Sequence, residues 1–316
     1  MIDHAIELGD VHCLILKIYA HFKWEAGREA VVALLAMATL LALFSSLLWG
    51  TADYHGGKLS KTHPAIAVLG ISQAIGLIFG IALAVISGDF SSNAFGTNGY
   101  FFPGALAGIL GYCGLICLYA GLSTGRMGVV SPISGLSALI PVGYAYFVKG
   151  DRLSLILSIG AALAIVGAFL ASGPEMSQGL PMKPLVLALG AAAGFGTALV
   201  FMAIGSQGSA LMTMVMMRAT TFFVSLGILA KYRTFGGLTI KHAPILIFIG
   251  CADFLANLLL GVATTKGNLT LSMVLGALYP IFTALLAFQF LHERLHKVQY
   301  LGIFAAVAGV AIISAF

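Results

Sequence analysis

Three ionisable side chains lie within long apolar stretches of this sequence, namely Asp53, Arg218 and Asp253. A charge in an apolar interior is costly, so such residues pair with one another or serve a function. We expect Arg218 to pair with Asp253 because both lie in the second half of the chain, which leaves Asp53 able to take up and release protons. Two alternatives stay open. In the first, residues 31–52 form the first apolar segment and Asp53 lies at the water interface. In the second, the pair at Arg218 is purely structural.

Uncharged polar side chains recur at helical spacing in the same stretches. One stripe contains Ser134, Ser137 and Pro141, and another contains Tyr279 and Thr283. A polar face with a helix-kinking proline is typical of a pathway through a membrane protein, although for any single serine hydrogen-bonded helix packing is the simpler interpretation. The residues expected to line a substrate or ion pathway are Trp49, Asp53, Gln73, Ser134, Ser137, Arg218, Asp253, Asn257, Tyr279 and Thr283, with hinges at Pro141 and Pro280.

The composition is typical of a membrane protein. Hydrophobic residues make up 60% of the 316 residues, charged residues make up 9%, and the mean hydropathy is +1.04. Apolar runs of about 20 residues can cross a bilayer as helices. The segments of this kind are 38–58, 64–87, 101–123, 128–148, 153–172, 184–204, 210–230, 243–265, 269–291 and 297–316.

Charge and cysteine content exclude several classes of function. The net charge of +5 is too dispersed for a nucleic-acid surface. The four cysteines form no CxxC motif and have no histidine at ligand spacing. We therefore expect no metal site, no cofactor and no nucleic-acid partner.

An internal repeat divides the chain. Residues 125–172 align with residues 267–314 without a gap at an offset of 142. Five membrane crossings in each repeat are an odd number, so the second repeat must be inverted. The expected fold is an all-α integral membrane protein of ten transmembrane helices in two inverted five-helix repeats. Its parts are a leader at 1–37, repeat one at 38–172, a linker at 173–183 and repeat two at 184–316. The leader is either an amphipathic surface helix or a stretch that precedes a true start at Met37.

The C-terminal stretch GALYPIFTALLAFQFLHERLHKVQYLGIFAAVAGVAIIS at 276–314 resembles the EamA-type members of the drug/metabolite transporter superfamily. The stretches LLWGTADYHGGKLS at 47–60, SQAIGL at 72–77 and GCADFLANLLLGVATTKG at 250–267 are similar to the same family. The resemblance implies alternating-access transport of small molecules with both termini in the cytoplasm. Repeat one departs from the pattern, because it has Ala138 where repeat two has Pro280, and Gly150-Asp151-Arg152 in place of the Glu-Arg motif.

The expected function is a secondary transporter of a small metabolite or drug-like solute, working as an exporter in the plasma membrane, with protons as a candidate coupling ion. No nucleotide-binding motif is present, so an ion or substrate gradient must supply the energy. The alternatives are an intramembrane enzyme and a non-transporting membrane receptor or scaffold. The first lacks a catalytic constellation in the apolar segments, so we expect no enzyme.

Two features leave the assembly and orientation open. Glycine motifs of the GxxxG type, such as Gly76-x3-Gly80, allow a homodimer or internal packing. With the termini in the cytoplasm, six Lys and Arg residues would lie inside and nine outside. Cytoplasmic loops are normally the richer in Lys and Arg, so this count favours the opposite orientation.

Overall fold

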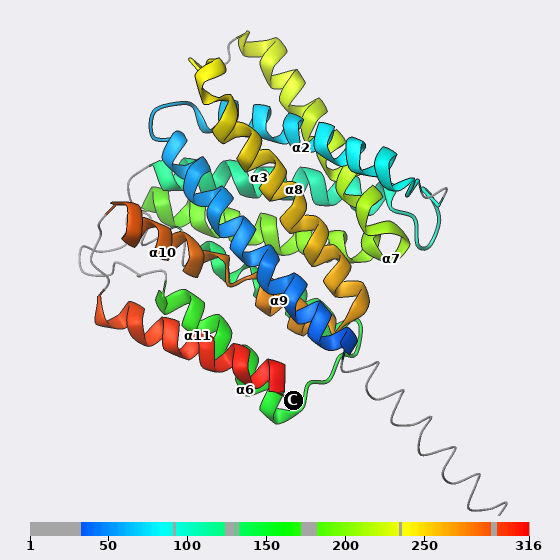
Figure 1. Ribbon diagram of the computed structural model, residues 1–316, viewed down its shortest axis with the longest axis vertical. Coiled ribbons are helices and arrows are strands. Elements are labelled where there is room, and N and C mark those ends of the chain that lie inside the picture. Colours follow the sequence, from blue (N-terminus) through cyan, green and yellow to red (C-terminus); the bar gives the residue numbers. More distant parts are fainter. Residues whose placement is uncertain are drawn as a thin grey trace, which may run out of the picture.

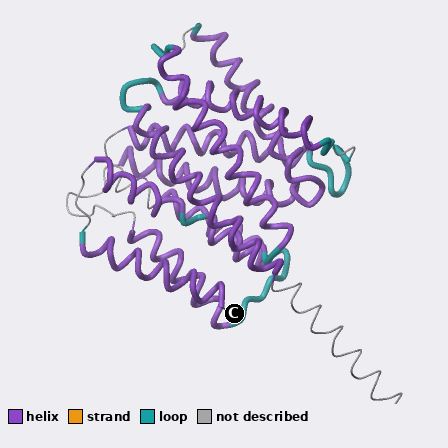
Figure 2. Tube along the Cα trace, viewed as in Figure 1, coloured by secondary structure: helices purple, strands orange, loops and turns teal. Residues whose placement is uncertain are grey.

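The computed structural model describes residues 33–90, 93–123, 130, 133–171, 182–233, 236–291 and 296–315. These residues form helices and connecting turns, without a strand (Figure 2). Most of the predicted leader, nearly all of the linker and the charged residues 292–295 lie outside the described residues.

The helices lie where the apolar segments predict them. In the first half the chain forms Ala33–Leu59, α2 (Ala65–Ser87), α3 (Phe101–Ser123), the short η1 (Leu136–Ala138) with α5 (Leu139–Phe147), and α6 (Leu155–Ala171). In the second half it forms α7 (Met182–Tyr232), the short η2 (Ile240–His242), α8 (Ala243–Lys266), α9 (Leu269–Gly276), α10 (Tyr279–Leu291) and α11 (Lys297–Ala315). Figure 1 shows them as one bundle, with α6 and α11 side by side along one edge.

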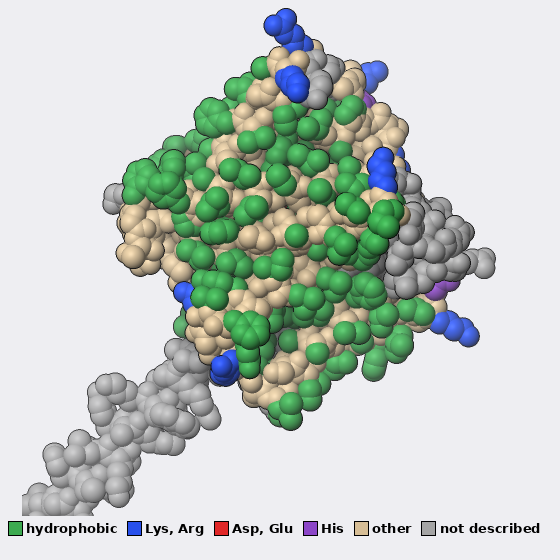
Figure 3. All heavy atoms as spheres, turned by 180° about the vertical axis from the view of Figure 1, so that it is seen from behind, with side chains coloured by type: hydrophobic (Ala, Val, Ile, Leu, Met, Phe, Trp, Pro, Cys, Tyr) green, Lys and Arg blue, Asp and Glu red, His purple; other side chains and the backbone are tan. Residues whose placement is uncertain are grey.

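Five helices in the described part of the chain are long and apolar enough to cross a membrane: 33–59, 65–87, 101–123, 182–231 and 240–266. Large apolar side chains cover the outside of the bundle (Figure 3), among them Ile86, which is 82% exposed, and Phe304, which is 73% exposed. In water such a surface would aggregate, whereas lipid tails accept it. The protein is therefore an integral membrane protein.

Helix α7 is interrupted at its middle. Ser209 has φ −163° and ψ 117°, which is extended backbone between two helical stretches. The hydroxyl of Ser209 accepts a hydrogen bond from the Met212 amide at 3.1 Å, which caps the second stretch. The break lies between the two segments, 184–204 and 210–230, that the sequence predicts.

The fourth apolar segment of each repeat is also broken. In the first repeat the backbone tightens to a 3-10 turn at Leu136–Ala138, and in the second α9 and α10 are separated by Ala277 and Leu278. At the offset of 142 residues 136–138 fall on 278–280, so the two breaks overlap at Leu278. They also meet in space, since a Cβ added to Gly135 would lie 2.9 Å from Pro280 Cγ. Pro141 and Pro280 are both buried next to these breaks.

Glycines in α6 and α11 show how the two repeats pack. A Cβ on Gly309 would lie 2.6 Å from the carbonyl oxygen of Gly160, and one on Gly167 would lie 2.8 Å from that of Gly302. The helices are thus antiparallel. At the offset of 142, Gly160 corresponds to Gly302 and Gly167 to Gly309. Gly160 therefore contacts the counterpart of Gly167, and Gly167 contacts the counterpart of Gly160. This exchange is the contact pattern of a two-fold axis.

The same exchange recurs near the centre of the bundle. A Cβ on Gly50 would lie 2.7 Å from the carbonyl oxygen of Tyr279, and one on its counterpart Gly196 would lie 2.6 Å from that of Ser137. Ser137 and Tyr279 correspond at the offset of 142. The first segment of each repeat therefore packs on the fourth segment of the other.

The GxxxG motifs are occupied by these internal contacts. Gly76 lies against the Gly250 carbonyl, Gly80 against the Phe254 ring, and Gly108 against the Met217 backbone. Small residues let helix backbones approach closely, and here the approaching backbones belong to the same chain. The motifs consequently carry no argument for a homodimer.

Candidate functional site: a cavity between the two repeats

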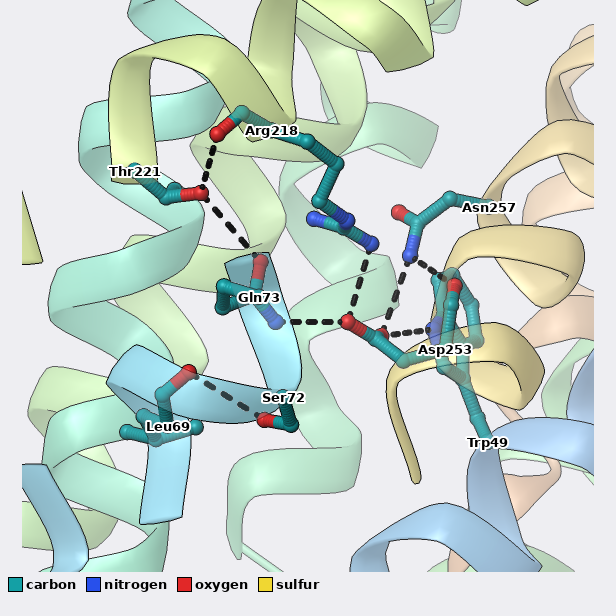
Figure 4. A network of polar contacts seen from close by, with 8 residues as sticks. All are labelled: Trp49, Leu69, Ser72, Gln73, Arg218, Thr221, Asp253 and Asn257. Carbon is teal, nitrogen blue, oxygen red and sulfur yellow. Dashed lines mark hydrogen bonds and ion pairs between the residues drawn. The ribbon is translucent and has the colours of Figure 1, made fainter. Parts of the chain in front are cut away.

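The carboxylate of Asp253 is the centre of the polar network in this bundle (Figure 4). Arg218 Nη2 lies 2.9 Å from Asp253 Oδ2 and Gln73 Nε2 donates to the same oxygen at 2.8 Å. Trp49 Nε1 donates to Oδ1 at 3.1 Å and Asn257 Nδ2 at 3.2 Å. All four partners are N–H donors, which matches the acceptor-only character of an ionised carboxylate. The predicted pairing of Arg218 with Asp253 is confirmed.

Further hydrogen bonds fix the orientation of these donors. Thr221 donates to Gln73 Oε1 at 3.4 Å and to the carbonyl of Arg218 at 3.0 Å. Asn257 Nδ2 also donates to the backbone carbonyl of Asp253 at 2.7 Å. The i, i+4 spacing of Asp253 and Asn257 on α8 makes this contact geometrically natural. Arg218 Nε is buried and has no hydrogen-bond partner in the described part of the chain.

Asp53 has very different surroundings. It lies within the helix Ala33–Leu59 and is 8% exposed, so its side chain is buried in the bundle. Within the described residues no hydrogen bond or ion pair reaches its carboxylate.

A cavity of about 680 Å³, its open mouth included, lies between the two repeats. Of the residues predicted to line a pathway, the following lie in its wall: Trp49, Asp53, Gln73, Ser137, Arg218, Asp253, Asn257 and Tyr279. They come from the first helix, α2, η1, α7, α8 and α10. Residues from both repeats therefore converge on one buried space.

Ser134 and Thr283 lie outside this wall. Ser134 accepts a hydrogen bond from the Tyr279 hydroxyl at 3.2 Å. Thr283 donates to the carbonyls of Gly50, at 3.1 Å, and Tyr279, at 3.2 Å. Both hold the broken helices against their neighbours. The simpler interpretation given above for a single serine, hydrogen-bonded packing between helices, therefore describes the contacts of both side chains.

Sequence reasoning missed part of the wall. Tyr112 and Phe195 contribute aromatic rings, and Gly108 and Gly111 of α3 also lie in the wall. Tyr112 follows Gly108 by one helical turn, a signal that could have identified this face of α3. Tyr119, further along α3, is 2% exposed and packs against Gly56.

The fold and the cavity define a class: an α-helical membrane protein of two repeats that enclose a largely apolar cavity with a buried ion pair in its wall. The model of the EamA-like transporter family matches residues 36–173 and 182–315, and the chain belongs to that family. The two matches correspond to the two repeats read from the sequence.

A protein known from a crystal structure has a similar fold, with a TM-score of 0.70 at 18% sequence identity. The match covers 87% of this chain and 95% of the other. At that identity the likeness concerns the fold alone. No curated protein matches the chain.

Proposed function

We propose that this protein is a secondary transporter that exports a small metabolite or drug-like solute by alternating access. The observation that carries the proposal is the convergence of both repeats on one buried cavity with an ion pair and a separate carboxylate in its wall. Apolar spans that bury charged groups around a cavity are typical of solute and proton pathways. An enzyme or a passive receptor would not need charged groups supplied by two symmetrically packed halves.

The wall indicates the chemical class of the solute. Trp49, Tyr112, Phe195 and Tyr279 supply aromatic surface, and the polar atoms are concentrated around Asp253 and Asp53. Binding sites of this composition take ligands with an apolar body and few polar groups, whose positions the charged residues fix. The proposed solute is therefore small and amphipathic.

The broken helices are the proposed moving parts. The breaks at 136–138 and 277–278 adjoin the cavity, since Ser137, Ala277 and Tyr279 lie in its wall. Discontinuous helices at a repeat interface are typical of transporters in which one repeat rocks against the other. Pro141 and Pro280 are the proposed hinges, within a molecule of ten crossings and two inverted repeats.

Asp53 is the proposed site of proton coupling. Asp53 is buried without a hydrogen-bond or ion-pair partner within the described residues, whereas Asp253 is held by Arg218 and three further N–H donors. On this proposal a proton binds and leaves Asp53 as the cavity changes access, and Asp253 keeps its partners. We further propose that the protein lies in the plasma membrane with both termini in the cytoplasm.

Reconstitution tests the proposal. Proteoliposomes with an imposed pH gradient should accumulate solutes from a panel of small amphipathic compounds, and Asp53→Asn should abolish this accumulation. Counterflow exchange, which needs binding and reorientation but no proton gradient, should remain measurable. Asp89→Asn, an exposed aspartate at the end of α2, serves as the matched control. Undiminished gradient-driven uptake by folded Asp53→Asn protein would overturn the coupling role, and the absence of transport from wild-type vesicles would overturn the function.

A further inference from the structure

A second hollow lies on the outside of the bundle, between α2 and the last turns of α7. It encloses about 1310 Å³, its open side included. Its wall runs along α2 from Pro64 to Ile78 and along α7 from Phe222 to Leu229, and it ends at Gly236. The central cavity and this groove share no lining residue.

The shape of the groove follows from the sequence of α2. Ala67, Gly70 and Ala74 recur at i, i+3 and i+7, so their small side chains form one shallow strip along the helix. A Cβ on Gly70 would lie 3.5 Å from Ser225 Cβ, which places the floor of the groove at this helix contact. Larger side chains on either side, including Ile71 and Leu226, form the walls.

The groove has the dimensions of a site for a lipid tail. From residue 64 to residue 78, α2 rises roughly 21 Å at about 1.5 Å per residue. One leaflet of the hydrocarbon core is about 15 Å deep, half of about 30 Å. Both helices cross the membrane, so the open side faces hydrocarbon, and apart from Ser225 the lining side chains are apolar.

The end of the groove near Pro64 and Gly236 is basic. Lys61, Arg233 and Lys241 are exposed there, on the two connecting segments that meet where Gly236 packs on Pro64. The sequence has no Asp or Glu between Asp53 and Asp89 or between Glu175 and Asp253, so no carboxylate of these segments offsets the charge. In Figure 3 basic side chains gather at the tip formed by the end of α7 and the start of α8, with no acidic side chain visible on that face.

Arg233 also has an unusual backbone conformation. Its φ is 50°, a left-handed value that glycine adopts most easily and that is uncommon for other residues. Its amide donates to the Leu229 carbonyl at 2.7 Å and so ends α7 directly above a groove residue. The backbone of Arg233 thus lies beside the end of the groove that Leu229 and Gly236 line.

We propose that the α2–α7 groove binds an anionic phospholipid, with one acyl chain along Ala67, Gly70 and Ala74 and the phosphate at Arg233 and Lys61. An apolar channel with a basic mouth at the depth of the headgroups matches both parts of such a lipid. The inference requires only that α2 and α7 lie in a membrane, so it is independent of the transport proposal. It also has a consequence for the cavity, because Ser225 at the groove floor is hydrogen bonded to the Tyr112 hydroxyl at 2.7 Å, and Tyr112 lines the cavity.

Native mass spectrometry of the purified full chain tests the proposal. The protein is delipidated in detergent and titrated with phosphatidylglycerol or with phosphatidylcholine of the same acyl chains. We expect the wild type to bind phosphatidylglycerol more tightly. The double variant Lys61→Gln/Arg233→Gln should lose about five-fold in affinity for each removed charge, for phosphatidylglycerol only. Ala74→Phe, which fills the groove, should weaken binding of both lipids.

Matched controls separate the groove from the general lipid surface. Val85→Trp enlarges a 62% exposed side chain on the same helix outside the groove, and Lys266→Gln removes an exposed charge at the end of α8. Both should bind as the wild type does. Glutamine at 233 meets the same backbone cost as arginine, so the charge variant should fold, and its elution on size exclusion verifies this. Equal affinity for the two lipids in the wild type, or unchanged binding in the folded charge variant, would overturn the proposal.

Discussion

At the scale of single residues, the cavity contains two aspartates whose partners differ completely. Asp253 accepts hydrogen bonds from Trp49, Gln73 and Asn257 in addition to its ion pair with Arg218. Asp53 has no such partner within the described residues. The proton-coupling proposal rests on this difference, because it assigns the exchangeable proton to Asp53 and the fixed charge to Asp253.

Breaking the ion pair should destabilise the protein. Asp253→Asn leaves Arg218 buried without a counter-charge, and removing one partner of a buried pair costs about 3–5 kcal/mol. Arg218→Ala should have a similar effect, because it leaves the carboxylate unpaired. Thermal unfolding in detergent measures both, with Asp89→Asn as the exposed control. The double variant should lose less stability than the sum of the two, since the residues are in direct contact. Wild-type stability of both single variants would contradict the structural importance of the pair.

The sequence predicts the charged residues of the cavity better than its uncharged ones. An aspartate or arginine in an apolar helix has few ways to be buried, so its position already implies a polar centre. A serine or threonine can satisfy itself on its own helix, as Ser72 and Thr264 do by donating to carbonyls three residues earlier. Its polar character alone therefore does not indicate the cavity. Ser134 and Thr283 are instead bonded to neighbouring helices and lie outside the wall, while Ser137, one turn from Ser134, lies in it.

At the scale of helices, close packing of glycines replaces the hydrophobic effect. Lipid tails are as apolar as the side chains they would exchange for, so helices associate through close backbone approach and van der Waals contact. The crossing of α6 and α11 is of this kind, with Gly160, Gly167, Gly302 and Gly309 at the contact. The repeat predicts that these glycines correspond to one another. It does not predict that they meet, because contact between distant segments depends on tertiary packing.

A side chain at this crossing should separate the two helices. Gly309→Leu would place its Cβ 2.6 Å from the Gly160 carbonyl, and overpacking of a tight contact typically costs about 1–3 kcal/mol. Lower thermal stability in detergent is the expected result. Gly227→Leu is the control, since a Cβ at Gly227 on α7 meets nothing within 4 Å. Equal stability of the two variants would show that the crossing tolerates a side chain, which means that α6 and α11 lie further apart than these distances indicate.

At the scale of the whole molecule, two contacts between loops bear on the inversion of the repeats. The loop after the first helix of repeat one meets the loop that follows α7 in repeat two, through Pro64 and Gly236. On the other side, Asp151 after α5 accepts a hydrogen bond from Thr270 at the start of α9, at 3.1 Å. Counted within each repeat, the first connection of repeat one meets the second connection of repeat two. The fourth connection of repeat one meets the third connection of repeat two. With parallel repeats these loops would lie on opposite faces of the membrane.

Single cysteines at exposed lysines should therefore label in two groups. In a variant without the four native cysteines, Lys61→Cys and Lys241→Cys should react with a membrane-impermeant maleimide from one side, and Lys149→Cys and Lys266→Cys from the other. With both termini in the cytoplasm, the first group reacts in intact cells and the second only after permeabilisation. If the two groups are labelled from the opposite sides, the termini lie outside the cytoplasm, and the inversion of the repeats is unaffected. The excess of Lys and Arg on the face of Lys61 favours that orientation. Labelling of Lys61→Cys and Lys241→Cys from different sides would instead contradict the inverted arrangement itself, and with it the two-fold relation that places residues of both repeats around one cavity.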